Sequence, residues 1–384
     1  MALVKPDLNT FAKIKVLGIG GGGNNAIDSM IKSGLIKGVE FVAVNTDAQT
    51  LLKCQADTKL QIGDKLTRGL GSGANPKIGR EAAEESKDKL QELLFDSDMV
   101  FLTCGMGGGT GTGASPIIAE ISKEAGALTV AVVTKPFLFE GTRRMVTAEE
   151  GVENLKEKVD TQIVVPNQRL MDVIDKNVTL IEAFQLADGV LSQGVQGISD
   201  LITTAGLINV DFADVKSVMA DAGTALMGVG SGVGENRAQT AARSAIASPL
   251  LETSIEGAKG MLFNIIGGTD LTMSEVHKAA EIISKAADAD ANIIFGANVD
   301  EALVDQIRIT VIATGFDETR QRLKQLSAKP IITPTAISSD DDADDDEDKP
   351  EEDKEPNGEP KEFSEVIDEE TDEFDIPAFL RQGR

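Results

Sequence analysis

The sequence predicts an α/β protein with a doubly wound parallel sheet, a long central helix, a smaller α+β domain and a disordered acidic tail. Three observations lead to this prediction. Short apolar runs alternate with helical stretches in the first half of the chain, residues 179–204 keep helical periodicity, and acidic residues crowd near the C-terminus. Alternating strands and helices are typical of βαβ units, which build parallel sheets.

Five apolar runs are the expected strands of the first domain, which we place at residues 13–178. Runs of this kind suit the buried strands of a parallel sheet. Residues 1–12 precede them and are expected to form a flexible arm. The five runs are Ile14–Ile19, Val39–Val44, Met99–Thr103, Leu128–Val133 and Thr161–Val165.

Residues 179–204 are expected to form one helix of roughly 39 Å that acts as a spine between two domains. Residues 205–316 form the second, α+β domain. Its expected strands are Thr224–Val229, Gly260–Ile266, Asn292–Gly296 and Gln306–Ala313. Its expected helices are Asn236–Ala247 and Ser274–Ala287.

The formal net charge of −26 is unevenly distributed. Residues 340–375 hold 21 acidic residues and 3 lysines, a charge of −18, whereas residues 1–339 carry only −10 and the last nine residues +2. Low hydropathy and high charge do not offset the entropy of an ordered chain. We therefore expect a disordered acidic linker at residues 317–366, followed by a separate terminal peptide at residues 367–384.

Composition excludes several classes of protein. No Lys/Arg cluster suits nucleic acid, and no apolar run approaches the roughly 18 residues of a membrane span. The N-terminus lacks the apolar core of a signal peptide, so we expect the protein in the cytoplasm. Two cysteines without CxxC spacing and the single His277 disfavour a disulfide scaffold, a structural zinc site and a His-based catalytic triad.

Gly18–Gly23 matches GxGxxG between an expected strand and helix. A glycine loop there lets backbone N–H groups meet a phosphate. The signal is weak, because it fits NAD, FAD and nucleoside phosphates equally, and a tight turn without a ligand stays an alternative.

Gly105–Gly113 is a more specific signal, because glycine is costly in chain entropy and this loop alternates it with threonines. Backbone N–H groups and Thr hydroxyls suit phosphate oxygens. The loop has no lysine and so differs from a P-loop. Together with Gly69–Pro76, three such loops fit a nucleoside triphosphate better than a dinucleotide.

These motifs resemble the FtsZ family, the bacterial tubulin-like cell-division GTPases. The signature GGGTGTG stands at 107–113, with NTDAQ at 45–49, GLGSGANP at 69–76, KPFLFEGTRR at 135–144 and NVDFADV at 209–215. The resemblance covers roughly residues 13–316 and the terminal peptide. It implies a self-polymerising GTPase of the cytoskeleton that forms the division ring at midcell.

The resemblance implies that GTP or GDP is bound by these loops, with Mg²⁺ as the expected cation and K⁺ as an alternative, and it assigns no ligands to either. It assigns the phosphates and nearby sugar or base atoms to the first two glycine loops, the γ-phosphate to the Ala74 loop, and the ribose and phosphate side to Glu140 and Arg144. The implied nucleotide-binding residues are Gly21, Gly22, Asn25, Asp47, Ala48, Gly73, Ala74, Gly107, Gly108, Gly109, Thr110, Gly111, Thr112, Gly113, Pro136, Glu140, Arg144, Asn167, Phe184 and Asp188.

Guanine recognition is assigned by the resemblance to Asn167, Phe184 and Asp188. An aromatic ring can stack on a purine, and a carboxylate can accept the guanine N1–H and amine hydrogens, which adenine does not offer. From the sequence alone, Phe184 could equally be a core residue of the long helix. Gly189 departs from the family pattern, and we expect it to loosen the helix locally.

The nucleotide loops contain no obvious carboxylate to activate water. Asp47 is one candidate, which we expect near metal or phosphate. Asp211 and Asp214 suit a helix N-cap and its N3 partner. The resemblance implies instead that this catalytic synergy loop enters the next subunit's nucleotide pocket, where Asp211 and Asp214 polarise water and Asn209 orients it. A contact of this kind is heterologous and builds filaments.

The terminal peptide resembles the family's adaptor-binding segment, which implies membrane-tethering and regulatory partners but no membrane insertion by the chain itself. A solvated tail without function is the alternative. The matching positions are Asp375, Ile376, Pro377, Phe379, Leu380 and Arg381.

Two other functions stay open at this point. A Rossmann-type NAD(P) oxidoreductase would use Gly18–Gly23 and Asp47, but it leaves the second glycine loop unexplained and lacks a catalytic Tyr or a suitably placed His. A non-catalytic tubulin-like scaffold is the other, and Asn209, Asp211 and Asp214 argue against it.

Overall fold

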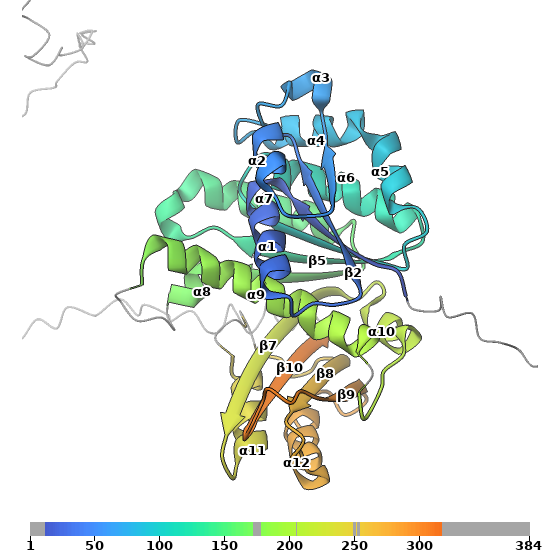
Figure 1. Cartoon of the computed structure of the whole chain (residues 1–384), viewed down its shortest axis with the longest axis vertical. Helices are drawn as coiled ribbons and strands as arrows, with labels where there is room; N and C mark the ends of the chain where they lie inside the picture. Colours follow the sequence, from blue (N-terminus) through green and yellow to red (C-terminus); the bar gives the residue numbers. More distant parts are fainter. Residues whose placement is uncertain (1–11, 172–177, 205, 249–250, 252–253, 317–384) are drawn as a thin grey trace, which may run out of the picture. The chain divides into compact units, whose positions relative to one another are not determined.

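Ten strands follow one another in a hydrogen-bonded sheet, in the order β3-β2-β1-β4-β5-β6-β7-β10-β8-β9 (Figure 1). The computed structural model describes residues 12–171, 178–204, 206–248, 251 and 254–316. The predicted acidic linker and terminal peptide, and all but the last residue of the predicted arm, lie outside these residues. The domain boundaries stay predictions.

The first six strands are all parallel, as the sequence predicted. The five predicted strands are present, each within two residues of its expected ends. The sequence analysis missed β3, which is short and mostly polar. The strands are β1 Ile14–Ile19, β2 Val39–Asn45, β3 Thr58–Gln61, β4 Met99–Gly105, β5 Leu128–Lys135 and β6 Thr161–Pro166.

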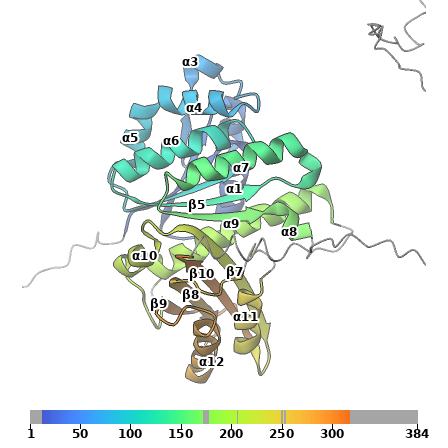
Figure 2. The same cartoon turned by 180° about the vertical axis from the view of Figure 1, so that it is seen from behind.

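Helices cover both faces of this parallel sheet, because successive strand side chains point to opposite faces. Val16 and Phe101 belong to a core with α1 (Gly20–Ser33) and α9 (Leu180–Thr203). Leu17 and Leu102 belong to a second core on the opposite face. That core is shared with α4 Pro76–Glu85, α5 Lys87–Leu94, α6 Thr110–Glu124 and α7 Thr142–Lys156. Figures 1 and 2 show the sheet from its two sides, with α1 in front in the first view and α4 to α7 in front in the second.

The last four strands form the mixed part of the sheet. β10 is antiparallel to both β7 and β8, and β8 is parallel to β9. Two helices pack on this part and share a third core. It joins the parallel part through a short pairing of β6 with β7. The elements are β7 Gly223–Val233, β8 Gly260–Gly267, β9 Asn292–Val299, β10 Gln306–Thr314, α11 Arg237–Ile246 and α12 Met273–Ser284.

Helix α9 (Leu180–Thr203) confirms the prediction of one long helix at residues 179–204. Thr179 caps its N-terminus in a reciprocal capping box with Glu182. Its apolar side packs on the parallel sheet through Val195 and Ile198, which are fully buried. On the mixed part of the sheet, Thr310 of β10 lies so close that Gly197 has no room for a β-carbon. The helix therefore contacts both parts of the sheet.

The first two glycine loops, Gly18–Gly23 and Gly105–Gly113, are partly helical, where the sequence analysis expected loops. Gly20–Gly23 is the first turn of α1, and Thr110–Gly113 is the first turn of α6. Gly23 allows this because a β-carbon there would overlap the carbonyl oxygen of Thr103 on β4. The shorter helices are α2 Ala48–Lys53, α3 Asp64–Thr67, η1 Leu138–Glu140, α8 Asn167–Met171 and α10 Phe212–Met219. None of the described helices is long and apolar enough to cross a membrane.

Candidate functional site

The strand order reverses between β1 and β4, which are adjacent in the sheet. In open α/β sheets, ligands bind beyond the carboxyl ends of the strands at such a reversal. The loops that follow β1, β2, β4, β5 and β6 all leave the sheet at this edge, which we call the carboxyl edge. Most of the predicted nucleotide-binding residues lie on these loops, so the fold brings them to one side of the sheet.

The turn from β1 into α1 presents open backbone. Gly21, Gly22 and Asn25 are exposed, and nothing lies within 4 Å of where a β-carbon on Gly21 would be. Neither α1 nor α6 has an acidic residue in its first turn. The unpaired N–H groups at a helix N-terminus attract anions. Two such termini at one edge suit a phosphate chain.

The glycines at 107–113 serve two different purposes. Gly108 has no neighbour within 4 Å of a β-carbon position, so its backbone is open to a ligand. Gly109 and Gly113 are packed against the backbone of Asn75 and Pro76, where a side chain would overlap. The sequence analysis explained this glycine run by phosphate binding. The structure adds a packing role, because Gly109 and Gly113 let α4 approach α6.

The threonines of the same loop are engaged in holding it together. The Thr110 hydroxyl lies 2.7 Å from the Thr46 hydroxyl and 2.9 Å from that of Ser72. The Thr112 hydroxyl accepts a hydrogen bond of 2.9 Å from the Gly107 N–H. Both threonines are buried. They position the loop backbone, and the free donors toward a ligand are the amides.

The loop at residues 69–76 is built from left-handed backbone. Gly71, Gly73 and Ala74 have φ values of 84°, 58° and 58°. For Ala74, a non-glycine residue, this conformation is unfavourable and is typical of functional loops. Gly73 and Ala74 are exposed, and the loop ends at Asn75, which caps α4 by accepting from the Lys77 N–H.

Asp47 caps α2, and the partly buried Ala48 follows it as the first helical residue. Its carboxylate accepts hydrogen bonds of 2.8 Å from the Gln49 N–H and the Thr50 hydroxyl. The hydrogen bond from Thr50 is the main reason why the pKa of Asp47 is lowered. The structure thus places Asp47 as a fixed local cap, and all its hydrogen bonds among the described residues are local.

One side of the carboxyl edge holds a buried polar atom without a partner among the described residues. Asn167, which begins α8 directly after Pro166 of β6, is buried, and its Oδ1 has no hydrogen-bond partner there. Buried polar groups in folded proteins almost always have partners, so Asn167 Oδ1 points to a polar ligand. Asp188 on α9 is half-buried, and burial raises its pKa to about 7.

Phe184 is 41% exposed, so its interpretation as a core residue is wrong. Its ring meets the ring of Phe137 edge-on, at 5.5 Å between centroids, and that of Phe139 at 6.4 Å. Pro136 directly precedes this aromatic group and is buried. Gly189 does not interrupt the helix, because α9 runs unbroken from Leu180 to Thr203.

Glu140 and Arg144 lie beside the aromatic group and contact each other. Their ion pair measures 2.8 Å from Oε2 to Nη1, and Glu140 Oε1 accepts a hydrogen bond of 2.9 Å from the Phe137 N–H. Arg144 keeps half of its side chain exposed. This leaves guanidinium donors available on the same edge.

The predicted catalytic residues lie elsewhere. Asn209, Asp211 and Asp214 are exposed and follow the C-terminal end of α9, whereas Phe184 and Asp188 lie near its N-terminal end (Figure 1). Asp211 caps α10 by accepting a hydrogen bond of 2.8 Å from the Asp214 N–H, as the capping interpretation predicted. Asn209 Oδ1 accepts from the Gly206 N–H at 2.6 Å. Within one chain, these residues and the carboxyl edge are not brought together.

The sequence analysis missed two positioning residues at the carboxyl edge. Asn45 Nδ2 donates to Asn24 Oδ1 at 2.7 Å, and Asn24 Nδ2 donates to the Gly18 carbonyl at 3.2 Å. Asn45 Oδ1 also accepts from the Thr46 N–H at 2.9 Å. This buried pair fixes the β1 and β2 loops to each other. The signal was present as the Asn doublet after the glycines and the Asn that opens NTDAQ.

A protein metal centre is not evident in the part of the chain that the structure describes. No group of three or more His, Cys, Asp or Glu residues gathers there in a metal-binding arrangement.

Comparisons with known proteins agree with this geometry. The GTPase-domain model of the Tubulin/FtsZ family matches residues 13–175, and the C-terminal-domain model of the FtsZ family matches residues 223–317. An empty FtsZ dimer from M. jannaschii is 50% identical, with a TM-score of 0.77 over 81% of this chain and 90% of that chain.

Two more distant structures share the fold. CetZ1 from Haloferax volcanii, a GDP-bound monomer, is 21% identical with a TM-score of 0.69, over 82% of this chain and 98% of that chain. CetZ2 from the same organism, a GTPγS-bound protofilament, is 17% identical with a TM-score of 0.66, over 82% and 99%.

Proposed function

Because the chain belongs to the FtsZ family and carries its GTPase domain, we propose that it hydrolyses GTP at sites shared between head-to-tail subunits of a filament. It is a tubulin-like protein of the cytoskeletal class that binds GTP or GDP. The filament, the shared site and the division ring are the parts that we propose.

The observation that carries the proposal is the separation of two half-sites along α9. Among the described residues, the carboxyl edge offers open backbone and the unpaired Asn167 Oδ1, whereas Asp47, the predicted carboxylate near its phosphate side, is used as a cap. The exposed Asp211 and Asp214 lie beyond the other end of α9, a helix of 24 residues or about 36 Å. A second copy, stacked head to tail, would bring these carboxylates to the edge.

The proposed chemistry assigns a role to each half-site. At the carboxyl edge, Gly21, Gly22 and Gly108 offer backbone donors for the phosphates, while Asn167 and Asp188 meet guanine and Phe184 stacks on it. From the next subunit, Asp211 and Asp214 polarise the attacking water and Asn209 orients it. Preorganised groups of this kind stabilise the charge that develops on the transferred phosphate.

Magnesium fits this site only through the nucleotide. The described residues hold no ready cluster of metal ligands. The phosphate oxygens would be its main ligands, with the incoming Asp211 and Asp214 as candidate protein ligands. When bound, the cation would neutralise charge on the phosphates. Potassium stays a second candidate.

We also propose that the filaments form the division ring in the cytoplasm at midcell. The terminal peptide, with Asp375, Ile376, Pro377, Phe379, Leu380 and Arg381, would bind membrane-tethering adaptors, and the acidic linker would give it reach. Deleting residues 370–384 should abolish adaptor binding and leave GTP turnover unchanged. Loss of polymerisation in this truncation would contradict the assignment.

One assay distinguishes the proposal from an NAD(P) oxidoreductase and from a non-catalytic scaffold. Turnover of GTP, ATP and NADH is measured across protein concentration, with light scattering recorded in parallel. We expect GTP turnover per subunit to rise steeply where scattering appears. Asp211→Ala should bind GTP without turnover. A turnover per subunit that stays constant on dilution would contradict the shared site.

A further inference from the structure

Lys123, near the C-terminal end of α6, connects two carboxylates that lie far apart in the sequence. Its Nζ is 3.0 Å from Asp160 Oδ1 and 2.9 Å from Asp221 Oδ1. Asp160 directly precedes β6, and Asp221 lies in the turn between α10 and β7. We call these three residues the Lys123 clasp.

Asp160 also holds the α10–β7 turn directly. Its Oδ2 accepts from the Thr129 N–H of β5 at 2.8 Å, which fixes the carboxylate to the parallel sheet. Its carbonyl oxygen accepts from the Gly223 N–H at 2.9 Å, and its Oδ1 lies 3.4 Å from the Asp221 N–H. Asp160 is only 7% exposed. The turn is therefore attached to the GTPase domain at a buried, ordered point.

The charges of the clasp reinforce one another. Burial acts to lower the pKa of Lys123, but the hydrogen bonds that Lys123 donates to Asp221 and Asp160 outweigh it and the pKa is raised. The hydrogen bond from Lys123 lowers the pKa of Asp221. Lys123 and Asp221 are thus both ionised at neutral pH.

The clasp connects elements that lead to the two half-sites. Helix α6 begins at Thr110, inside the glycine loop of the carboxyl edge, and ends next to Lys123. Helix α10 begins after Asp211 and ends two residues before Asp221. We propose that Lys123 is a positioning residue for the shared reaction: it fixes the turn after α10 to the parallel sheet of its own subunit, and so holds Asp211 and Asp214 of α10 in the position from which they reach the next subunit. This inference rests on the proposed function.

The same geometry predicts a small contribution to stability. The Asp221 side chain is 84% exposed, and ion pairs at exposed positions contribute little to the free energy of unfolding. The Asp160 side chain is only 10% exposed, but it keeps the N–H donors of Thr129 and Asp221 when the charge of Lys123 is removed. A displacement of catalytic groups by about 1 Å can nevertheless lower turnover by up to about a hundredfold. Removal of the charge should therefore affect turnover more than stability.

The test compares Lys123→Met with Lys123→Arg, which keeps the charge, and with the matched control Lys158→Met. Lys158 pairs at 3.0 Å with Glu120 of α6, the helix that also carries Lys123, and its described ion pair does not involve α10 or the turn after it. We expect Lys123→Met to lower turnover in assembled filaments about tenfold, with GTP affinity, melting temperature and scattering threshold close to wild type. Lys123→Arg should restore most of the turnover, and Lys158→Met should resemble wild type.

Two results would overturn the inference: turnover of Lys123→Met equal to that of Lys158→Met, or an equal loss in Lys123→Arg. A loss that parallels a fall in melting temperature would also overturn it, because the role would then be structural. Failure of the proposed function is seen separately, in wild-type turnover that does not depend on protein concentration.

Discussion

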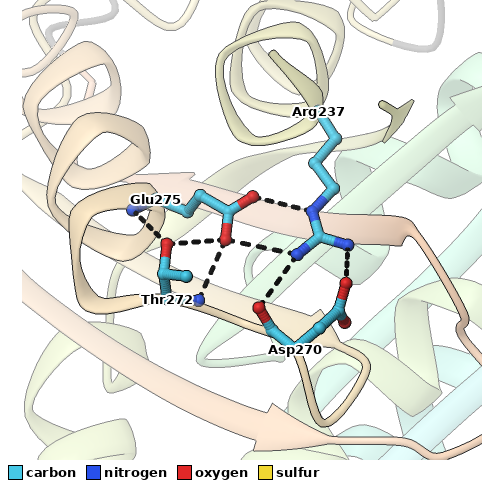
Figure 3. A network of polar contacts seen from close by, with 4 residues as sticks. All are labelled: Arg237, Asp270, Thr272 and Glu275. Carbon is cyan, nitrogen blue, oxygen red and sulfur yellow. Dashed lines mark hydrogen bonds and ion pairs between the residues drawn. The ribbon is translucent and has the colours of Figure 1, made fainter. Parts of the chain in front are cut away.

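The polar groups of the carboxyl edge and those between α11 and α12 differ in how completely they are paired. Arg237 of α11 donates from Nε to Glu275 Oε1 at 2.7 Å and from Nη1 to Asp270 Oδ2 at 2.5 Å (Figure 3). Its Nη2 donates to the Asp270 carbonyl and to Glu275 Oε2, both at 3.2 Å. Thr272 completes the network through its own hydrogen bonds with Glu275. At the carboxyl edge, by contrast, Asn167 Oδ1 is unpaired among the described residues.

This difference separates a structural network from a binding site. A buried polar group that is satisfied within the chain stabilises the fold, whereas one that is left unsatisfied costs free energy until a ligand pairs with it. Asn264 of β8 is an exception, because both its side-chain polar atoms are buried and unpaired among the described residues, and the hydroxyls of Ser97 and Thr103 are buried and unpaired as well. The structure gives no physical account of these atoms.

The largest effect is expected from breaking the closed network. Arg237→Met would leave the largely buried carboxylate of Glu275 without its main partner, and we expect a loss of about 3 kcal/mol in the free energy of unfolding. Urea denaturation measures it. Arg243→Met, an exposed change on the same helix, is the control. GTP affinity should stay near wild type in both, and equal stability of the two variants would break the comparison.

Lowering the pH should weaken the stabilisation that the same network provides. Hydrogen bonding from Arg237 lowers the pKa of Glu275 from 4.5 to about 2. The stabilisation is therefore complete above about pH 4.5 and is lost as the pH falls towards 2. The wild-type advantage in stability over Arg237→Met should shrink over that range.

A smaller effect is expected from the two kinds of glycine at the carboxyl edge. A β-carbon on Gly109 would overlap Ser72 and lie 2.7 Å from the Asn75 nitrogen, whereas Gly108 has open space. We expect Gly109→Ala to lower the free energy of unfolding by about 2 kcal/mol. Gly108→Ala should leave stability unchanged and weaken GTP binding. Thermal melts and nucleotide titrations would refute the assignment if the two variants behaved alike.

The smallest effect is expected in the pH dependence of GTP affinity. Burial raises the pKa of Asp188 to about 7, and guanine N–H donors bind only its ionised form. Affinity for GTP should therefore rise with pH up to about 7 and then level off, with about a tenfold difference between pH 6 and pH 8. Asp188→Asn should bind more weakly and lose this dependence, while any slope from the nucleotide's own phosphates stays. Parallel pH profiles in the two proteins would exclude the role.

Much of the fold was predictable because its signals are local. The five predicted parallel strands are mostly apolar runs, and α9 shows its period of three to four residues over its whole length. The strand Thr58–Gln61 was missed because only one of its four residues is apolar. Helix α2 was missed because its six residues are too few to show a period.

The site was predictable in part. The open backbone of Gly21 and Gly108 follows from glycine patterns, but the packing role of Gly109 and Gly113 depends on residues 75–76, which only the folded chain brings near. Asp211 illustrates a second limit. As a cap it satisfies local rules, and its proposed catalytic role depends on another copy of the chain, which no local pattern encodes.

The most direct test of the shared site uses two complementary variants. Asp188→Asn should accept xanthosine triphosphate, because the Asn amide can donate to the carbonyl that replaces the guanine amine. Its own turnover of that nucleotide is the control. Asp211→Ala keeps a guanine pocket but lacks the activating carboxylate. With both nucleotides present, phosphate release from labelled GTP is measured for each variant alone and for their mixture. The account predicts GTP turnover only in the mixture, where Asp211 of one subunit serves the GTP of the next. GTP turnover in the mixture no higher than the sum of the separate variants would contradict it.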